Sequence, residues 1–441
     1  MNHSISRSAQ RAFMLSIAAS GAGLAQAVTS TAAMNVKVRQ LPAAVATTSD
    51  SIGSVASVRQ LSNGNILVND QARRRVVLMD PTMKLIGVVA DTTSNTNRAY
   101  GASPGGLIAF RGDSTLLIAT ASLSMHLIDP NGKIVRTMAA PRASDINALI
   151  GGPRGNPGFD AKGRLVYRAS VNEGRSLRTS QTGQTFTMLT PPDSAMLVRY
   201  DLITRTLDTV GYFKIPKSYS NISMDADGRP SFNVQNNPLP VVDDWAVLSD
   251  GTVAIVRGSD YHAEFIDAAG VRTVSDKIPY EWQRLTDDDK SRILDSAKVV
   301  LEKRRVAMPS AGGGRAPQMM TMTSEGPSTG LPPVRVAGAA PDSASLPPLV
   351  MVPISELSDY KPVFGVGAIR ADSDERLWVR TIPTTPTTGG ALYDVIDKSG
   401  KLVDRIQVPA GTAIAGFGTG GVVYLGMRDA TGLHLQRVLS R

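Results

Sequence analysis

The stretch NGNILVNDQARRRVVLMDP, residues 63–81, decides the fold. It places a tight turn at Asn63-Gly64 before a β-branched strand, then a loop, then a second apolar strand that ends at Asp80. Residues 250–270, DGTVAIVRGSDYHAEFIDAAG, repeat this order, and in both segments the turn glycine precedes the strand-end aspartate by 16 residues. Short apolar runs bounded by Gly, Asp and Asn turns are typical of β-hairpins. Repetition of such a unit predicts a solenoid or a propeller.

The same unit occurs six times along the chain. Two apolar runs, separated by a loop, stand out in every copy and are read as its second and third strands. These pairs of runs are residues 66–68 and 76–79, 116–118 and 126–128, 165–167 and 197–200, 253–256 and 265–266, 377–379 and 393–396, and 422–425 and 433–438. Six units of this kind predict an all-β fold, a six-bladed β-propeller.

The first unit also carries a family resemblance. Val68-Asn69-Asp70 followed by Arg75-Val76-Val77-Leu78-Met79-Asp80 resembles the NHL-repeat blade, and the chain is similar to the exported six-bladed β-propellers of bacteria. The resemblance covers nearly all of the chain outside one long insertion. It implies a fold without a single activity, because that group includes binding modules, lyases and lactonases. The axial acid-and-asparagine metal site of the lactonases is not recognisable in this sequence.

The two ends of the chain are expected to meet in one sheet. The sixth unit runs out at Arg441 without an outer strand, and an unpaired strand edge favours aggregation. Residues 35–41, NVKVRQL, alternate in polarity and belong to no unit. We expect this segment to pair as the outer strand of the last blade. The predicted fold is therefore a six-bladed β-propeller closed by an N-terminal strand, with one helical and low-complexity insertion.

The first 27 residues have the pattern of a secretory signal peptide. Arg7 and Arg11 precede an apolar run, and Ala25-Gln26-Ala27 forms a small-x-small cleavage site. The run is too short to span a bilayer. We therefore expect an exported protein, periplasmic or extracellular, with the propeller in residues 28–441 and no transmembrane segment after cleavage. The chain has no cysteine, so burial and strand pairing must supply its stability.

The chain is basic. It has 47 Lys and Arg against 38 Asp and Glu, a formal charge of +9 that falls to +7 once the signal peptide is removed. A basic exterior favours anionic partners. The longest basic run is only Arg73-Arg74-Arg75, so no nucleic-acid-binding motif is present. The expected partner is an anionic small molecule, a glycan or a protein, and we expect the propeller to be a monomer.

One long insertion covers residues 279–364. Apolar residues at helical spacing, preceded by Thr286 with Asp289 three positions on, predict a helix over about 286–306. The following tract, about 307–350, is rich in Pro, Gly, Ala, Ser and Met and is predicted to be flexible. The helix is either a flap over the site or a decoration of the rim.

The long connections of the chain are expected on one face of the disc. Within a four-stranded blade, the loop between the second and third strands shares a face with the connection to the next blade, and we call this the elaborated face. Loops gathered over a rigid scaffold usually form the binding surface. The long segments of these two classes are residues 91–104, 140–158, 169–195, 216–240, 279–364 and 381–390.

Arginine recurs at the end of the second strand in four units. If these strand ends meet at the mouth of the channel, their guanidinium groups would form a ring suited to carboxylate or phosphate. The alternative is that they are solvated rim residues. With residues expected beside them, the predicted ligand-binding set is Arg168, Arg257, Arg380, Arg428, Asp70, Arg73 and Tyr261.

His262 and Asp260 are the catalytic candidates. Asp260 precedes His262 closely enough to orient it as a base. A structural histidine is the alternative, because no partner histidine or metal-ligand spacing accompanies it. The sequence predicts no cofactor, with a calcium ion on the propeller axis as the alternative. The leading hypothesis is a binding module that uses the elaborated face, and the rival is a lyase or lactone hydrolase that uses the same face.

Overall fold

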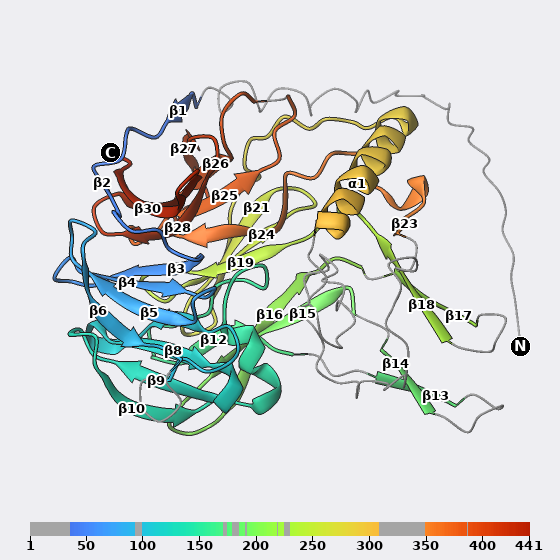
Figure 1. Cartoon of the computed structure of the whole chain (residues 1–441). Coiled ribbons are helices and arrows are strands. Elements are labelled where there is room, and N and C mark those ends of the chain that lie inside the picture. Colours follow the sequence, from blue (N-terminus) through green and yellow to red (C-terminus); the bar gives the residue numbers. More distant parts are fainter. Residues whose placement is uncertain are drawn as a thin grey trace, which may run out of the picture. The chain divides into compact units, whose positions relative to one another are not determined.

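The computed structural model of the chain describes residues 36–92, 99–170, 174–178, 185–189, 192–217, 219–224, 230–307, 349–385 and 387–441. The expected signal peptide and nearly all of the low-complexity tract lie outside these residues. Six sheets form a six-bladed β-propeller closed by an N-terminal strand, and this confirms the predicted fold class (Figure 1). Within the described residues, no helix is both long and apolar enough to cross a membrane.

Each blade is built on antiparallel strands that follow one another in sequence, except that the last blade takes its outer strand from the N-terminal segment. The first strands contact one another around the ring in the order β28, β3, β7, β11, β19, β24. Blade one consists of β3 (Val55–Gln60), β4 (Ile66–Asp70), β5 (Arg75–Met79) and β6 (Leu85–Ala90), and blade two of β7 (Gly106–Ala109), β8 (Thr115–Ala119), β9 (Ser124–Ile128) and β10 (Ile134–Ala139). Blade three consists of β11 (Gly158–Phe159), β12 (Leu165–Arg168), β15 (Ser194–Tyr200) and β16 (Leu207–Lys214), and blade four of β19 (Asp244–Val247), β20 (Val253–Arg257), β21 (His262–Ile266) and β22 (Arg272–Val274). Blade five consists of β24 (Phe364–Ala371), β25 (Leu377–Thr381), β26 (Leu392–Ile396) and β27 (Leu402–Gln407), and blade six of β28 (Thr412–Gly418), β29 (Val422–Asp429), β30 (Gly432–Leu439) and β2 (Ala46–Thr47).

The insertions add a few elements to the blades. The loop between β12 and β15 holds the hairpin β13 (Gly174–Arg178) and β14 (Thr185–Leu189). The strands β17 (Tyr219–Met224), β18 (Pro230–Asn236) and β23 (Val350–Met351) form a separate small sheet. The predicted helix is observed as α1 (Asp287–Ala307). At its start the Asp289 N–H donates to Thr286 Oγ1 at 3.2 Å and the Thr286 N–H donates to Asp289 Oδ2 at 3.0 Å, which is the expected capping box.

A repeated aspartate turn explains the spacing seen in the sequence. In each of blades one to five the carboxylate after the third strand accepts hydrogen bonds from the backbone N–H two residues on and from a second N–H beyond it. Such side-chain bonds hold the chain in a tight turn. These aspartates are Asp80, Asp129, Asp201, Asp267 and Asp397.

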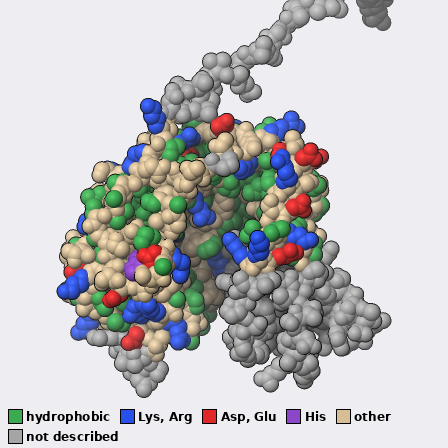
Figure 2. Space-filling view, turned by 45° about the horizontal axis from the view of Figure 1, so that its top comes forward, with side chains coloured by type: hydrophobic (Ala, Val, Ile, Leu, Met, Phe, Trp, Pro, Cys, Tyr) green, Lys and Arg blue, Asp and Glu red, His purple; other side chains and the backbone are tan. Residues whose placement is uncertain are grey.

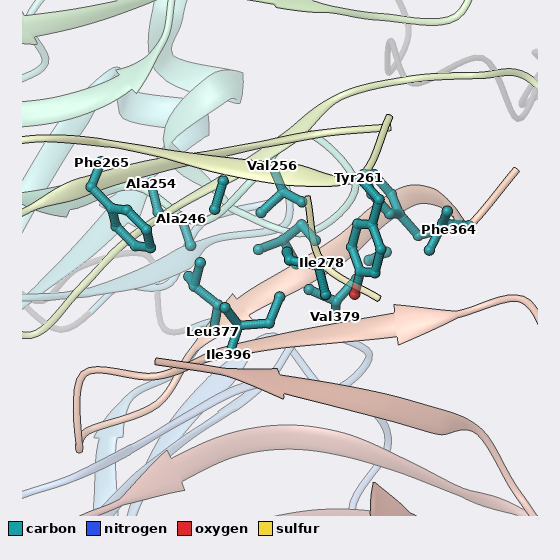
Figure 3. Packing of buried hydrophobic residues seen from close by; sticks show 14 of the residues in the cluster. Ala246, Ala254, Val256, Tyr261, Phe265, Ile278, Phe364, Leu377, Val379 and Ile396 are labelled. Carbon is teal, nitrogen blue, oxygen red and sulfur yellow. The ribbon is translucent and has the colours of Figure 1, made fainter. Parts of the chain in front are cut away.

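The blades pack face to face through apolar side chains. Between blades four and five, Val256 and Phe265 lie opposite Leu377 and Val379, with Tyr261 at one end of the cluster (Figure 3). Four of these five side chains are completely or almost completely buried. Strands with apolar neighbours on both faces read as continuous apolar runs rather than as an alternation. This is why the second strand of each blade stands out in the sequence.

The ring closes through an N-terminal strand, but not through the segment that the sequence predicts. β2 pairs antiparallel with β30, with Ala46 opposite Arg437. Residues 38–40 instead form β1 (Val38–Gln40), which runs parallel to β27 of blade five. The assignment of residues 35–41 to the last blade is therefore wrong. An alternating pattern identifies a half-buried strand but not its partner, and the two blades offer neighbouring edges.

Thr48 tests the closure, because it joins the two ends of the chain through its side chain. Its Oγ1 accepts a hydrogen bond from the Leu435 N–H at 3.1 Å in a buried position. Thr48→Val leaves that N–H unpaired and should lower the free energy of unfolding by about 1–3 kcal/mol. Thr47→Val, at the exposed neighbouring position, is the matched control and should change it little. Equal effects in urea titrations of the two variants would contradict the closure through β2.

Candidate functional site

The first strands of the six blades surround a central cavity of about 730 Å³. Its wall consists of β3, β7, β11, β19, β24 and β28 and of the turns after β7, β11, β19 and β24. We call the end of the channel at which first and second strands are joined the turn end. Figure 2 shows the hollow at the centre of the propeller, with Lys and Arg side chains along its wall. A cavity of this size suits a small molecule.

The connection between β10 and β11 lines the cavity with Asn156 and Pro157 and reaches blades four and five, and we call its residues 153–157 the floor. Asn156 forms a β-bridge with Ala246 of blade four, and its side-chain amide donates to the Ile369 carbonyl of blade five at 3.5 Å. The Trp245 indole N–H donates to the Arg154 carbonyl at 3.1 Å. A loop that leaves blade two thus touches blades four and five.

Two glycines permit this close approach. Gly155 has φ +96°, and a Cβ atom there would overlap the Trp245 ring. Gly367 in β24 has φ +68°, and a Cβ atom there would lie 2.9 Å from Pro153 Cα. A positive φ and a lack of space together require glycine at both positions. The floor therefore depends on backbone packed directly against the opposite wall.

Three cationic side chains line the cavity without a partner. They are Arg111, Lys162 and Arg370, and within the described residues none of them makes a hydrogen bond or an ion pair. Burial lowers the pKa of Arg370; the charge of Arg380 acts in the same direction, and the charges of Tyr393 and Asp244 oppose it. The Arg111 guanidinium lies 6.0 Å from the centre of the Phe110 ring. These groups remain available to a ligand.

The acidic side chains of the cavity are already neutralised. Each of them lies in the turn after a first strand and pairs at 2.7 Å with a basic residue that does not line the cavity. A fourth cation of the wall, Arg59, donates to Thr115 Oγ1 at 2.6 Å and lies 3.5 Å from Asp113. The cavity therefore has a net positive charge. The neutralised pairs are Asp160 with Arg164, Asp250 with Lys398, and Asp372 with Arg376.

Asp244 lies buried beside the floor, between blades four and five. Its carboxylate accepts the backbone N–H groups of Trp245 at 2.9 Å and Ile369 at 3.0 Å. Burial raises the pKa of Asp244 to about 7, although these hydrogen bonds and the charge of Arg370 oppose the shift. The carboxyl group therefore changes charge near neutral pH.

The four predicted arginines lie at the other end of the blades, on β12, β20, β25 and β29, and none of them is among the described residues that line the cavity. Arg257 is held by Glu264 at 2.8 Å and by Asp243 at 2.7 Å. The buried Arg168 lies over the ring of Phe213, at 6.0 Å from its centre. Arg380 and Arg428 are exposed. The structure does not bring these side chains together as one ring around the cavity.

The remaining predicted ligand-binding residues hold local structure. The buried Asp70 carboxylate accepts the N–H groups of Gly53 at 3.1 Å and Ser54 at 2.9 Å. Arg73 donates to the Ser51 carbonyl at 2.6 Å. The Tyr261 hydroxyl donates to Asp394 at 3.0 Å, and burial raises the pKa of Tyr261 well above its ordinary value. Their binding role stays a prediction.

The catalytic candidates are in contact with each other. His262 Nδ1 lies 2.8 Å from Asp260 Oδ1, and its Nε2 lies 3.8 Å from Glu264. They belong to the loop and strand that follow β20, outside the cavity. No group of His, Asp and Glu side chains suited to holding a metal ion occurs within the part of the chain that the structure describes. A catalytic role for His262 stays a prediction.

The cations of the cavity were not selected from the sequence, although a signal was present. All three lie within two residues of an aspartate at the turn between a first and a second strand. First strands line the channel, so such positions face the axis more directly than the ends of second strands. The pairs are Arg111 with Asp113, Lys162 with Asp160, and Arg370 with Asp372.

Comparisons with known proteins find distantly similar solved structures. No family model and no curated protein matches the chain. A Bacteroides fragilis protein described as exported is 9% identical with a TM-score of 0.41, covering 94% of this chain and 98% of its own. A DUF4221 family member from Bacteroides vulgatus is 9% identical with a TM-score of 0.40, over 91% and 99%. Virginiamycin B lyase from Staphylococcus aureus is 10% identical with a TM-score of 0.36, over 90% and 98%. These likenesses concern the fold and not the function.

Gly155 tests the floor of the cavity. Gly155→Ala adds a methyl group against Trp245, whereas Gly152, with φ +89°, has no atom within 4 Å of a Cβ placed there. Both variants carry the cost of a positive φ, and only the first carries the clash. Gly155→Ala should therefore lower the free energy of unfolding by at least about 1 kcal/mol more than Gly152→Ala. Equal losses in urea unfolding would place the loop away from Trp245.

The raised pKa of Asp244 should make the stability of the fold depend on pH. Its ordinary pKa of 3.8 applies to the unfolded chain, and its folded pKa is raised to about 7. Its stabilising contribution is complete below about pH 4 and is lost as the pH rises to 7. Between pH 5 and 7, Asp244→Asn should therefore show a smaller fall in melting temperature than the unmodified protein. Parallel melting curves for the two proteins across this range would refute the assignment.

Proposed function

We propose that this propeller is an exported binding module for an anionic small molecule, and that the ligand occupies the central cavity at the turn end. The observation that carries the proposal is a set of three cations, Arg111, Lys162 and Arg370, that make no ion pair with any described residue, in a cavity whose acids are neutralised. The proposal keeps the anionic ligand expected from the sequence but moves its site away from the elaborated face.

The charges of the cavity favour an anion for two reasons. Guanidinium groups form strong, directed hydrogen bonds with carboxylate and phosphate oxygens. A concave surface with charge of one sign also concentrates the potential and attracts ligands of the opposite sign. Burial of Arg370 costs free energy, because within the described residues no carboxylate pairs directly with its guanidinium, and an anionic ligand would recover part of that cost.

The shape of the cavity supports a small ligand rather than a polymer. In the proposed site the floor, residues 153–157, is the inner end of the cavity, and a ligand would enter from the turn end. The aromatic side chains of Phe110, Phe159 and Phe417 lie on the wall and offer apolar surface to its carbon skeleton. A mixture of apolar wall and a few charged groups is usual for small-molecule sites.

The elaborated face is a weaker place for this site. There Arg257 forms ion pairs with two carboxylates, and the Tyr261 hydroxyl donates a hydrogen bond to a third. An anion would have to displace those contacts before it could bind. The lyase or lactone hydrolase considered from the sequence would rely on His262 and Asp260, and these residues lie outside the cavity.

Isothermal titration calorimetry with citrate, glucarate and glucose 6-phosphate at low ionic strength tests the proposal. At least one of these anions should bind with one site per chain. The triple variant Arg111→Gln, Lys162→Gln, Arg370→Gln should weaken binding by at least about tenfold, because charge-assisted hydrogen bonds are lost. Arg136→Gln, which removes an exposed arginine of the outer strand β10, is the control for loss of a surface charge and should leave binding unchanged.

Two outcomes would refute the proposed site. In the first, none of the three anions binds to the folded protein. In the second, an anion binds, but the triple variant and the Arg136 control weaken it to the same degree. Circular dichroism of each variant should show an intact fold, because the three cavity side chains make no hydrogen bonds within the described residues that their loss would break.

A further inference from the structure

We propose that the ligand of the cavity is a dianion whose two charged groups are held on opposite walls. This inference rests on the proposed function and names its ligand class. Arg111 together with Lys162 forms one pole, and Arg370 forms the other. The position of these residues in the ring of blades carries the argument.

The order of the blades places the two poles across the channel. Arg111 follows β7 of blade two, and Arg370 lies in β24 of blade five. The first strands contact one another in the order β28, β3, β7, β11, β19 and β24. In a ring of six blades, three steps separate β7 from β24 in either direction. The two arginines therefore belong to opposite walls of the cavity.

Lys162 belongs to the same pole as Arg111. The Arg111 guanidinium packs against the turn of blade three, where a Cβ atom at Gly163 would overlap it. Lys162 is the residue next to Gly163 in that turn. The two positive charges of Arg111 and Lys162 thus lie on one wall of the cavity, and the positive charge of Arg370 lies on the opposite wall. A single carboxylate or phosphate can contact one of these poles but leaves the other without a counter-charge.

The wall between the poles suits a carbon skeleton. Phe110 and Phe159 pack edge to face near the first pole, with ring centres 4.9 Å apart. Phe417, from β28 of blade six, lies on the wall next to blade five and packs on Trp378, with ring centres 5.1 Å apart. These rings offer apolar surface between two charged ends. A dicarboxylate, or a sugar that carries two acidic groups, matches this arrangement.

A chain-length series tests the dianion. Calorimetry would compare succinate, glutarate, adipate, pimelate and suberate with the monocarboxylate of the same carbon number in each case. Because the poles are fixed, one dicarboxylate should bind at least about tenfold more tightly than its matched monocarboxylate, and shorter and longer members should bind less well. Arg111→Gln and Arg370→Gln, each alone, should reduce this dicarboxylate to the affinity of the monocarboxylate, whereas Arg136→Gln should not.

The outcomes separate this inference from the proposed function. If every dicarboxylate binds no more tightly than its matched monocarboxylate, or if chain length has no effect, the two-pole inference is overturned and the anion site stands. If Arg111→Gln weakens the dicarboxylate and Arg370→Gln does not, Arg370 is no pole and the inference also fails. If none of these carboxylates binds, and citrate, glucarate and glucose 6-phosphate do not bind either, both the two-pole inference and the proposed function fail.

Discussion

The contact between the β10–β11 connection and the opposite wall of the channel is the constraint on which the site depends. A β-propeller leaves a channel along its axis, and here glycines at 155 and 367 let the backbone of this loop meet Trp245 and Pro153 directly. In the proposed site this loop forms the inner end of the cavity. Everything proposed for the ligand follows from a cavity with one mouth, at the turn end.

The distribution of charge follows from the same architecture. First strands end in aspartate turns, and the aspartates of blades three, four and five take their counter-charges from outside the cavity. Within the described residues, this arrangement leaves Arg111, Lys162 and Arg370 as the cavity cations that make no ion pair. The basic excess of the whole chain is thus matched by a positive interior, whereas the acids and bases of blade four neutralise one another around Glu264.

The blades could be predicted from the sequence but the site could not, and the reasons are physical. The turn bonds of Asp80 and Asp267 are local, so their spacing is visible in the chain. Strand pairing is not local, and β1 therefore joined blade five although its alternation suited either edge. For Arg257 the strand position was evident, but its commitment to Glu264 depends on the neighbouring strand. The floor could not be predicted, because Gly155 and Trp245 are distant in sequence.

A crystal structure of the protein soaked in iodide tests the central claim most directly, because anomalous scattering locates bound anions without any assumption about the ligand. The account predicts the strongest iodide peak inside the central cavity, in contact with Arg370 or with the pole formed by Arg111 and Lys162. An empty cavity, with iodide bound instead around Arg380 and Arg428 on the elaborated face, would contradict it.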